Sequence, residues 1–418
     1  MTSTLALARS FDRPVRLLLV NQLTINIGFY MLMPYLAGHL SGALGLSAAV
    51  VGLILGVRNL GQQGMFLIGG TLADRFGYKP AIVAGCALRT AGFLLLGLAG
   101  TVPVLIAASV LTGLAGALFN PAVRAYLAEE AGERRVEAFA AFNAFYQLGI
   151  LAGPLIGFLL YKVDFSAVCL TAALMFAALT VAQLRALPPQ RTSTHRTGRP
   201  FLADWSEALS NRNFMLFAGA MSGSYILNFQ IYLTLPLEIR RTTGGELGVT
   251  LMFVLSGLLT IATQAHVTSW ATRRWTPPAA VTRGLFLMSA AFLPLALTAP
   301  FLPPTGPVPP MIPIMLTTTL LTLATMLAYP FEMATIITLA GDRMIATYYG
   351  IYNTLAGLGI ATGTLLSGLT LDIAHHSSLP SLPWTALTLI GTTCALALHL
   401  LSRKNRLTGT PHEADLQT

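Results

Sequence analysis

The feature that most constrains this 418-residue chain is a series of twelve apolar blocks separated by short polar turns. A run of about 20 apolar residues matches the thickness of a bilayer's hydrocarbon core when it forms a helix. The sequence therefore predicts an all-α membrane protein with twelve transmembrane helices. The blocks are residues 15–38, 47–70, 80–99, 102–127, 137–161, 165–185, 213–239, 247–269, 278–299, 311–339, 344–370 and 383–402.

The first block could be mistaken for a secretion signal, because Arg9, Arg13 and Arg16 precede it or open it. A signal peptide has an apolar region of about 7–15 residues, which is shorter than this block. We therefore expect the block to be retained as the first membrane helix.

Composition agrees with a membrane protein. Only 10% of the residues are charged, against about 25% in ordinary soluble domains. The formal net charge of +9 resides mainly in the turns between apolar blocks, so it indicates membrane orientation, and no nucleic-acid partner is expected. Cys86, Cys169 and Cys394 lie inside apolar blocks without metal or disulfide spacing. No cofactor and no metal site are predicted.

The positive charges also indicate the orientation. If both termini are cytoplasmic, 20 of the 25 Lys and Arg residues lie on the cytoplasmic side and 3 lie outside. Positively charged loops stay in the cytoplasm. We therefore expect a multi-pass protein of the inner (plasma) membrane with both termini cytoplasmic.

One long polar connection divides the twelve blocks into six and six. The expected domains are a six-helix bundle (1–185), a cytoplasmic linker (186–212), a second six-helix bundle (213–402) and a cytoplasmic tail (403–418).

The two halves repeat one another. Gly149 and Gly153 recur 210 residues later as Gly359 and Gly363. Repeated halves are typical of secondary transporters, whose site lies between two pseudo-symmetric bundles.

The clearest local motif follows the second block and runs from Gly69 to Pro80 as GGTLADRFGYKP. It resembles the signature between the second and third helices of the major facilitator superfamily, G-x-L-x-D-R-x-G-x-K. The glycines are expected to allow close backbone approach and a tight turn. The resemblance implies the major facilitator fold and a conformational latch, with Arg124 as the candidate partner of Asp74. The latch residues would be Gly70, Asp74, Arg75, Gly77, Lys79 and Arg124.

A second motif lies in the fifth block, at Gly149, Gly153, Pro154 and Gly157. It resembles the G-x-x-x-G-P-x-x-G motif of the drug/proton antiporter branch. Further similarity in the first three blocks points to multidrug exporters of the MdtH type. The resemblance implies proton-coupled efflux of hydrophobic or amphiphilic drugs or metabolites by alternating access. The chain departs from that branch at Ser109, where many members have an arginine.

Three charged residues fall inside the apolar blocks: Arg58, Arg89 and Glu332. A charge in the membrane interior is costly and usually faces a cavity or a partner. Glu332 is the candidate proton-titrating group, or else a structural counter-ion to an arginine. The two arginines are candidate coupling or cavity charges, or else contribute to helix packing.

A substrate cavity is expected between the halves. Its candidate residues are polar or aromatic, as suits a site for amphiphiles, although each could instead serve packing. They are Gln22, Asn26, Tyr30, Asn143, Tyr146, Gln147, Tyr225, Asn228, Tyr232, Tyr352 and Asn353.

Other functions remain open from sequence. The chain could export one endogenous product, such as a siderophore or an antibiotic. A proton-coupled nutrient importer is disfavoured by the motif of the fifth block. No nucleotide-binding motif, nucleophile elbow or His/Cys cluster is present, so an enzyme is not predicted. We expect a monomer that binds a small-molecule substrate, protons and the lipid bilayer.

Overall fold

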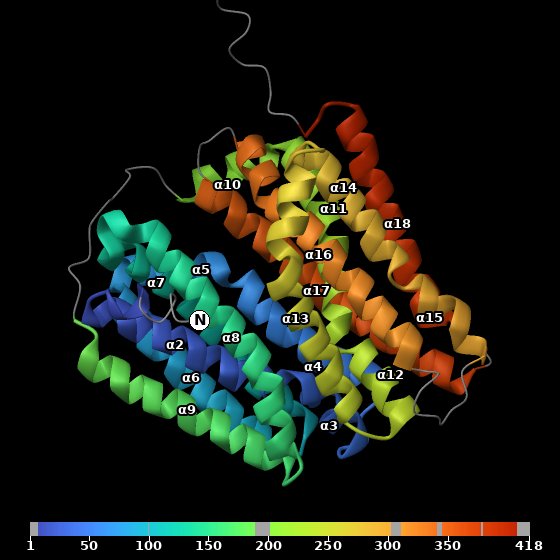
Figure 1. Ribbon diagram of the computed structural model, residues 1–418, viewed down its shortest axis with the longest axis horizontal. Helices are drawn as coiled ribbons and strands as arrows, with labels where there is room; N and C mark the ends of the chain where they lie inside the picture. Colours follow the sequence, from blue (N-terminus) through green and yellow to red (C-terminus); the bar gives the residue numbers. More distant parts are fainter. Residues whose placement is uncertain are drawn as a thin grey trace, which may run out of the picture.

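The computed structural model describes residues 7–98, 100–188, 201–301, 311–340, 345–377 and 379–407. These residues contain helices and no β-strand (Figure 1). Each of the twelve predicted blocks coincides with one helical segment of this part of the chain. The predicted all-α membrane architecture is confirmed.

The first half comprises six such segments. They are α2 (Arg13–Tyr30) with α3 (Met33–Gly42); α4 (Ala48–Asn59), η1 (Leu60–Gly64) and α5 (Phe66–Phe76); α6 (Tyr78–Leu98); α7 (Val102–Ala131), followed by the 3₁₀ turn η2 (Gly132–Arg134); α8 (Arg135–Tyr161); and α9 (Phe165–Ala186).

The second half comprises the other six. They are α11 (Arg212–Asn228), η3 (Phe229–Tyr232) and α12 (Thr234–Thr243); α13 (Leu247–Thr272); α14 (Pro277–Ala290), α15 (Leu293–Thr298) and η4 (Ala299–Phe301); α16 (Met311–Ala340); α17 (Ile345–His376); and α18 (Leu382–Arg403).

Eleven segments of the described chain are long and apolar enough to cross a membrane. The other predicted block forms α4, η1 and α5, and its middle carries polar residues that lower its hydropathy. Here η1 is a π-helical turn. Such turns occur often at functional sites, and this one carries Gln62 and Gln63.

The two halves lie side by side in Figure 1. The predicted polar linker contains a helix that was not predicted from the sequence, α10 (Phe201–Ser210). Residues 189–200 lie outside the described part. We call the end with α10 the α10 end, and the opposite end, with α3 and α12, the α3 end.

The sequence repeat corresponds to a repeated packing contact. A side chain at Gly149 of α8 would lie 2.5 Å from Asn26 of α2. At the matching position of the second half, one at Gly359 of α17 would lie 2.9 Å from Ser222 of α11. Both distances are too short for a side chain, so small residues allow the same close helix pairing in each half.

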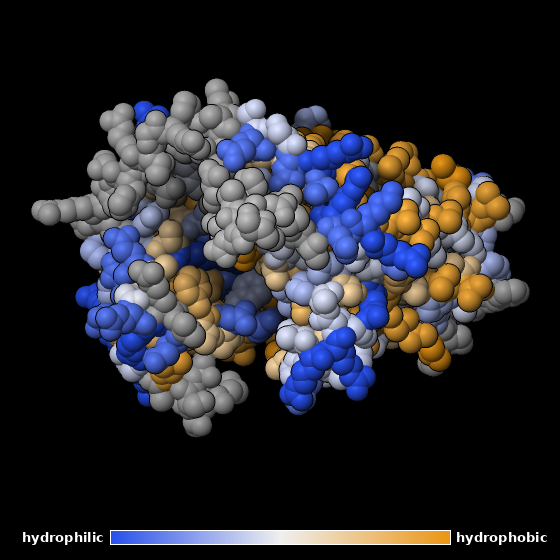
Figure 2. Space-filling view, turned by 90° about the horizontal axis from the view of Figure 1, so that it is seen from above, coloured by the Kyte–Doolittle hydropathy of each residue, from blue (hydrophilic) through white to orange (hydrophobic). Residues whose placement is uncertain are grey.

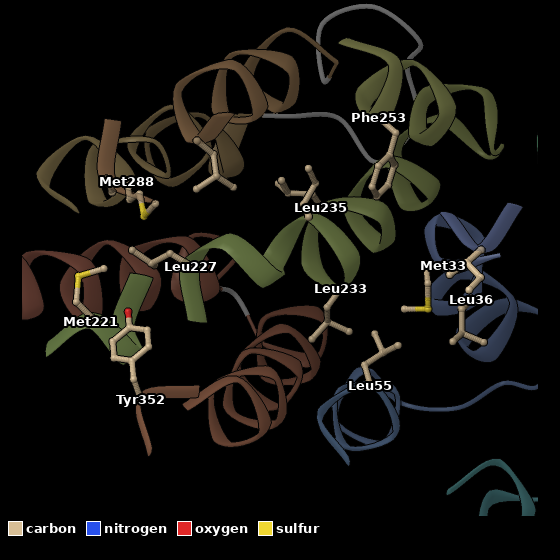
Figure 3. Packing of buried hydrophobic residues seen from close by; sticks show 14 of the residues in the cluster. Met33, Leu36, Leu55, Met221, Leu227, Leu233, Leu235, Phe253, Met288 and Tyr352 are labelled. Carbon is tan, nitrogen blue, oxygen red and sulfur yellow. The ribbon is translucent and has the colours of Figure 1, made fainter. Parts of the chain in front are cut away.

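The halves meet closely at the α3 end. Side chains added at Gly52 of α4 or Gly368 of α17 would clash with the other helix's backbone, at Thr364 and Ala48 respectively. Apolar residues of both halves also share one buried cluster there (Figure 3). Glycine therefore permits a close contact that seals this end between α4 and α17.

Candidate functional site: a cavity between the two halves

A cavity of about 240 Å³ lies between the halves. Its lining reaches toward the α10 end of α7 and α17, at Asn120, Arg124 and Tyr349. Figure 2, which views the molecule from the α10 side, shows it hollowed between the two halves. Six predicted cavity residues line this space: Gln22, Asn26, Tyr30, Tyr146, Tyr225 and Asn353.

A second cavity, of about 350 Å³, lies mainly between α8, α11, α13 and α16. Tyr30 and Tyr146 line both cavities. The other predicted residues that line the second cavity are Gln147, Asn228 and Tyr232. The two spaces are thus adjacent parts of one compartment with polar and aromatic walls.

Two predicted cavity residues line neither space. Asn143 is exposed on α8. Tyr352 is only 1% exposed, because its ring packs inside the second half against Phe217 and Tyr225, with ring centroids 6.2 and 6.0 Å away. Helical spacing alone could not distinguish a residue facing the cavity from one behind it.

Of the two predicted membrane arginines, Arg89 lines the 240 Å³ cavity. Its guanidinium lies among the rings of Phe29, Phe119 and Phe176, with the carbon Cζ 5.5–5.9 Å from their centroids. Arg58 is not among the lining residues. It donates hydrogen bonds to Asn59 (3.2 Å) and to Gln62 (2.9 Å).

Glu332 of α16 is 4% exposed. Its Oε1 accepts a hydrogen bond of 2.9 Å from the hydroxyl of Tyr225, a residue of the cavity wall. The second carboxylate oxygen is buried without a hydrogen-bond partner. Glu332 therefore lies one side chain behind the cavity, and Tyr225 connects the two.

None of the three membrane charges forms an ion pair with a described residue. The ion pairs in the described chain lie elsewhere and are Arg134–Glu137, Arg240–Glu246 and Arg241–Glu238. The counter-ion role considered for Glu332 thus has no arginine to support it in this arrangement.

The predicted latch segment forms the turn between α5 and α6. Gly77 has φ of +95°, which favours glycine, as the sequence predicted. Lys79 donates from Nζ to the carbonyl of Leu187 at 2.6 Å, and Arg75 is exposed beside the Phe76 ring. The side chain of Asp74 lies outside the described part.

The close-approach role expected of Gly70 belongs instead to Gly69. A side chain at Gly69 would clash with the backbone of Ala117 in α7, whereas one at Gly70 would make an ordinary contact, 3.9 Å from Pro121. The reason is the helical rotation of 100° per residue, which turns only one of two consecutive glycines toward the neighbouring helix.

The motif of the fifth block packs α8 against α2. Side chains at Gly153 and Gly157 would meet Tyr30 and Met31. The carbonyl of Pro154 accepts a hydrogen bond of 2.6 Å from the hydroxyl of Tyr35, a residue of α3. The motif thus fixes the wall of the cavity.

Polar contacts that nothing in the sequence predicted close the α3 end. Asp372 at the end of α17 accepts hydrogen bonds of 2.8 Å from the backbone N–H groups of Ala48 and Ala49, at the start of α4. The hydroxyls of Tyr35 and Thr250, from opposite halves, lie 2.8 Å apart. Asp372 therefore links α17 of the second half to α4 of the first. The contact is stabilising, because a negative carboxylate is favourable at the positive N-terminus of a helix.

Arg240 of α12 also joins the halves. It donates to the carbonyl of Gly38 in α3 and pairs with Glu246 at 2.6 Å. Burial raises the pKa of Glu246, and this effect exceeds the opposing attraction of Arg240 and the hydrogen bond from Tyr161. In the sequence, the only indication of this ion pair is that Arg240 and Glu246 lie six residues apart near the end of a predicted helix.

Two halves of membrane-crossing helices, with a central cavity that is sealed at one end, define a membrane transporter. The comparisons with known proteins agree. Residues 18–409 match the family model of the Major Facilitator Superfamily, and the chain belongs to this superfamily. It is a transporter and not an enzyme.

Named relatives span almost the whole chain. An uncharacterized MFS-type transporter of Mycobacterium tuberculosis is 47% identical over 398 residues, covering 95% of each chain. Multidrug resistance protein MdtH of Photorhabdus laumondii is 31% identical over 383 residues, covering 91% of this chain and 92% of the relative.

Solved structures share the fold. A POT family transporter in complex with 5-aminolevulinic acid superposes with a TM-score of 0.78 at 13% identity, covering 95% of this chain and 99% of the other. The nucleoside transporter NupG gives 0.77 at 12% identity, covering 93% and 100%.

Proposed function

We propose that this protein is a proton-coupled exporter of hydrophobic or amphiphilic compounds that works by alternating access. The observation that carries the proposal is the cavity between the halves, which extends toward the α10 end while contacts between the halves seal the α3 end. The name of the MdtH relatives, multidrug resistance protein, supports drugs or drug-like metabolites as cargo.

The distribution of positive charge supports placing the α10 end in the cytoplasm. The side that would hold both termini carries 20 of the 25 Lys and Arg residues. The arrangement described here is then inward-facing, ready to take up cargo from the cytoplasm or the inner leaflet. Export requires the opposite arrangement, in which the contacts at the α3 end separate and the α10 end closes.

Glu332 is the proposed proton carrier. Its carboxyl is buried in α16 and forms no ion pair with a described residue, and Tyr225 connects Glu332 to the cavity. Ser109, where many antiporters of this branch have an arginine, is buried in α7. Proton coupling through Glu332 requires no arginine at that position.

The test is an accumulation and efflux assay in an efflux-deficient bacterial strain that expresses the chain. The panel should include dyes, quinolones, macrolides and siderophores, each with and without a protonophore. We expect reduced accumulation of several amphiphiles, and the protonophore should abolish the effect. Efflux of a single compound would favour a dedicated exporter, and efflux that survives the protonophore would contradict proton coupling.

A further inference from the structure

We propose that the central cavity is a binding site for organic anions, in which Arg89 binds the negatively charged group of the cargo. The cargo class would be an amphiphilic carboxylic acid, including zwitterions that carry one, with an aromatic or other apolar body. This inference rests on the proposed function, because it specifies the compounds that the same cavity accepts.

Arg89 has the features of a ligand-binding group. The residue is only 5% exposed, yet it lines the cavity. Among the described residues, no hydrogen bond and no ion pair involves its guanidinium. A guanidinium presents five N–H donors in a planar fork that matches a carboxylate.

The three rings around Arg89 orient it without using these donors. Their centroids lie 5.5–5.9 Å from Cζ, near the outer limit of about 6 Å for a cation–π contact. Arg58 provides the contrast, because its two terminal nitrogens donate to Asn59 and Gln62. An arginine that served packing alone would be expected to have partners of this kind.

The charge of the cavity wall favours an anion. Arg89 and Arg124 line the 240 Å³ space, and none of the described residues that line it is acidic. The nearby carboxylate of Glu332 lies behind Tyr225 and bonds to that residue's hydroxyl. A low-dielectric cavity with positive charge on its wall attracts and concentrates negative ligands.

The remaining lining suits the other parts of such a ligand. Phe29 and Phe119 lie beside Arg89 and can cover an aromatic body. The amides of Gln22, Asn26 and Gln62 also face this space and can donate to a second carboxylate oxygen. Aromatic rings beside a few convergent polar groups are common in small-molecule sites.

The test compares two probes that differ in charge, 2-naphthaleneacetic acid and its neutral amide. Their affinities for the purified full-length protein in lipid nanodiscs are measured by calorimetry at neutral pH. We expect the acid to bind more tightly than the amide. In Arg89→Gln the affinity for the acid should fall about tenfold to a hundredfold, while the affinity for the amide stays within about twofold.

Two further variants make the result specific. Arg89→Lys keeps the charge and loses the planar fork, so its affinity for the acid should lie between wild type and Arg89→Gln. Arg185→Gln removes an exposed arginine at the end of α9 in the same half and should bind both probes like wild type.

Several outcomes would overturn the inference. They are absent binding of the acid, equal affinity of the wild type for acid and amide, or an equal loss of both in Arg89→Gln. A lower melting temperature of unliganded Arg89→Gln would also oppose it, because a packing role predicts that loss whereas a ligand-binding charge predicts none. Efflux of neutral amphiphiles without any preference for acids would contradict this inference and leave the proposed function intact. Binding of the acid through Arg89 without efflux of any compound would instead contradict the proposed function and leave the anion site intact.

Discussion

At the scale of single residues, burial and partners distinguish the charges of the membrane region. Arg58 donates to neighbouring amide oxygens, Arg89 faces the cavity, and Glu332 accepts a hydrogen bond from Tyr225. A charge in the membrane interior costs about 2.5–3.5 kcal/mol on insertion scales. The unpaired charges are therefore the residues whose replacement should affect function more than stability.

Glu332→Gln should leave folding intact and remove the response of transport to an imposed pH gradient. The amide can still accept a hydrogen bond from Tyr225 but cannot exchange a proton near neutral pH. Substrate flux into inverted vesicles, with and without a pH gradient, measures the effect. Glu207→Gln, at an exposed position of α10, is the matched control. Unchanged pH-driven flux in Glu332→Gln would rule out its role as proton carrier.

Glu246 should make closure of the α3 end depend on pH. Burial raises the pKa of Glu246 when this end is closed, whereas solvent contact in an open end would restore the ordinary value. The closed arrangement therefore binds the proton more tightly, and acidification toward the raised pKa should stabilise it, while a rise in pH through that pKa removes this stabilisation. The charged and polar groups around the carboxyl are Arg240, Tyr161 and Tyr35.

The distance between spin labels at exposed Ala43 and Leu247, one in each half, reports on this closure. The fraction with a short distance should increase as the pH falls, and Glu246→Gln should flatten the dependence. A closed fraction that increases with rising pH would have the wrong sign for this mechanism.

At the scale of helices, close pairing through glycine determines which contacts are permanent and which can separate. Within each half, α8 on α2 and α17 on α11 approach through Gly149 and Gly359. Between the halves, α4 meets α17 at Gly52 and Gly368. The hydrogen bonds from the backbone of Ala48 and Ala49 to the carboxylate of Asp372 are the polar part of this second contact.

Asp372→Asn should weaken closure of the α3 end. Loss of a helix cap costs about 0.5–2 kcal/mol, and about 1 kcal/mol corresponds to roughly a fivefold shift between open and closed populations. The same pair of spin labels measures the shift. Asp164→Asn is the control, because Asp164 precedes α9 at this end without a side-chain cap hydrogen bond. Equal distance distributions for Asp372→Asn and wild type would contradict the assignment.

At the scale of the whole molecule, two repeated bundles provide two arrangements, since sealing one end opens the other. The arrangement described here is sealed at the α3 end and hollowed toward α10 (Figure 2). The turn between α5 and α6 belongs to the open end and is well placed to act when that end closes. The role proposed for Asp74, by resemblance to the superfamily, is to hold that closed state.

Asp74→Asn should therefore reduce export at least about tenfold, which corresponds to about 1.4 kcal/mol of lost latch stability. The amount of protein in the membrane should not change, because the backbone at Asp74 is an ordinary helical position near the end of α5. Efflux rate per transporter is the measurement. Glu133→Gln, at an exposed site beyond α7, serves as control. Wild-type efflux by Asp74→Asn would exclude the latch.

The sequence by itself determined the membrane segments, because bilayer thickness and helical rise act locally along the chain. The family followed from the resemblance of two motifs, the one from Gly69 to Pro80 and the one in the fifth block. It also identified Arg58, Arg89 and Glu332, since a charge within an apolar run is visible without any fold. Helical spacing located most of the cavity residues but placed Tyr352 and Asn143 with them, because spacing gives a face of a helix and not what covers it.

Only the tertiary structure decided which charges have partners and which end is closed. Asp372 and the N-terminus of α4 are more than 320 residues apart in the chain, and Arg240 reaches Gly38 across the boundary between the halves. Such contacts depend on how two bundles dock, and docking is determined by the shape of whole surfaces. The same docking leaves Arg89 facing a cavity with no counter-charge among the described residues, which local sequence could not reveal.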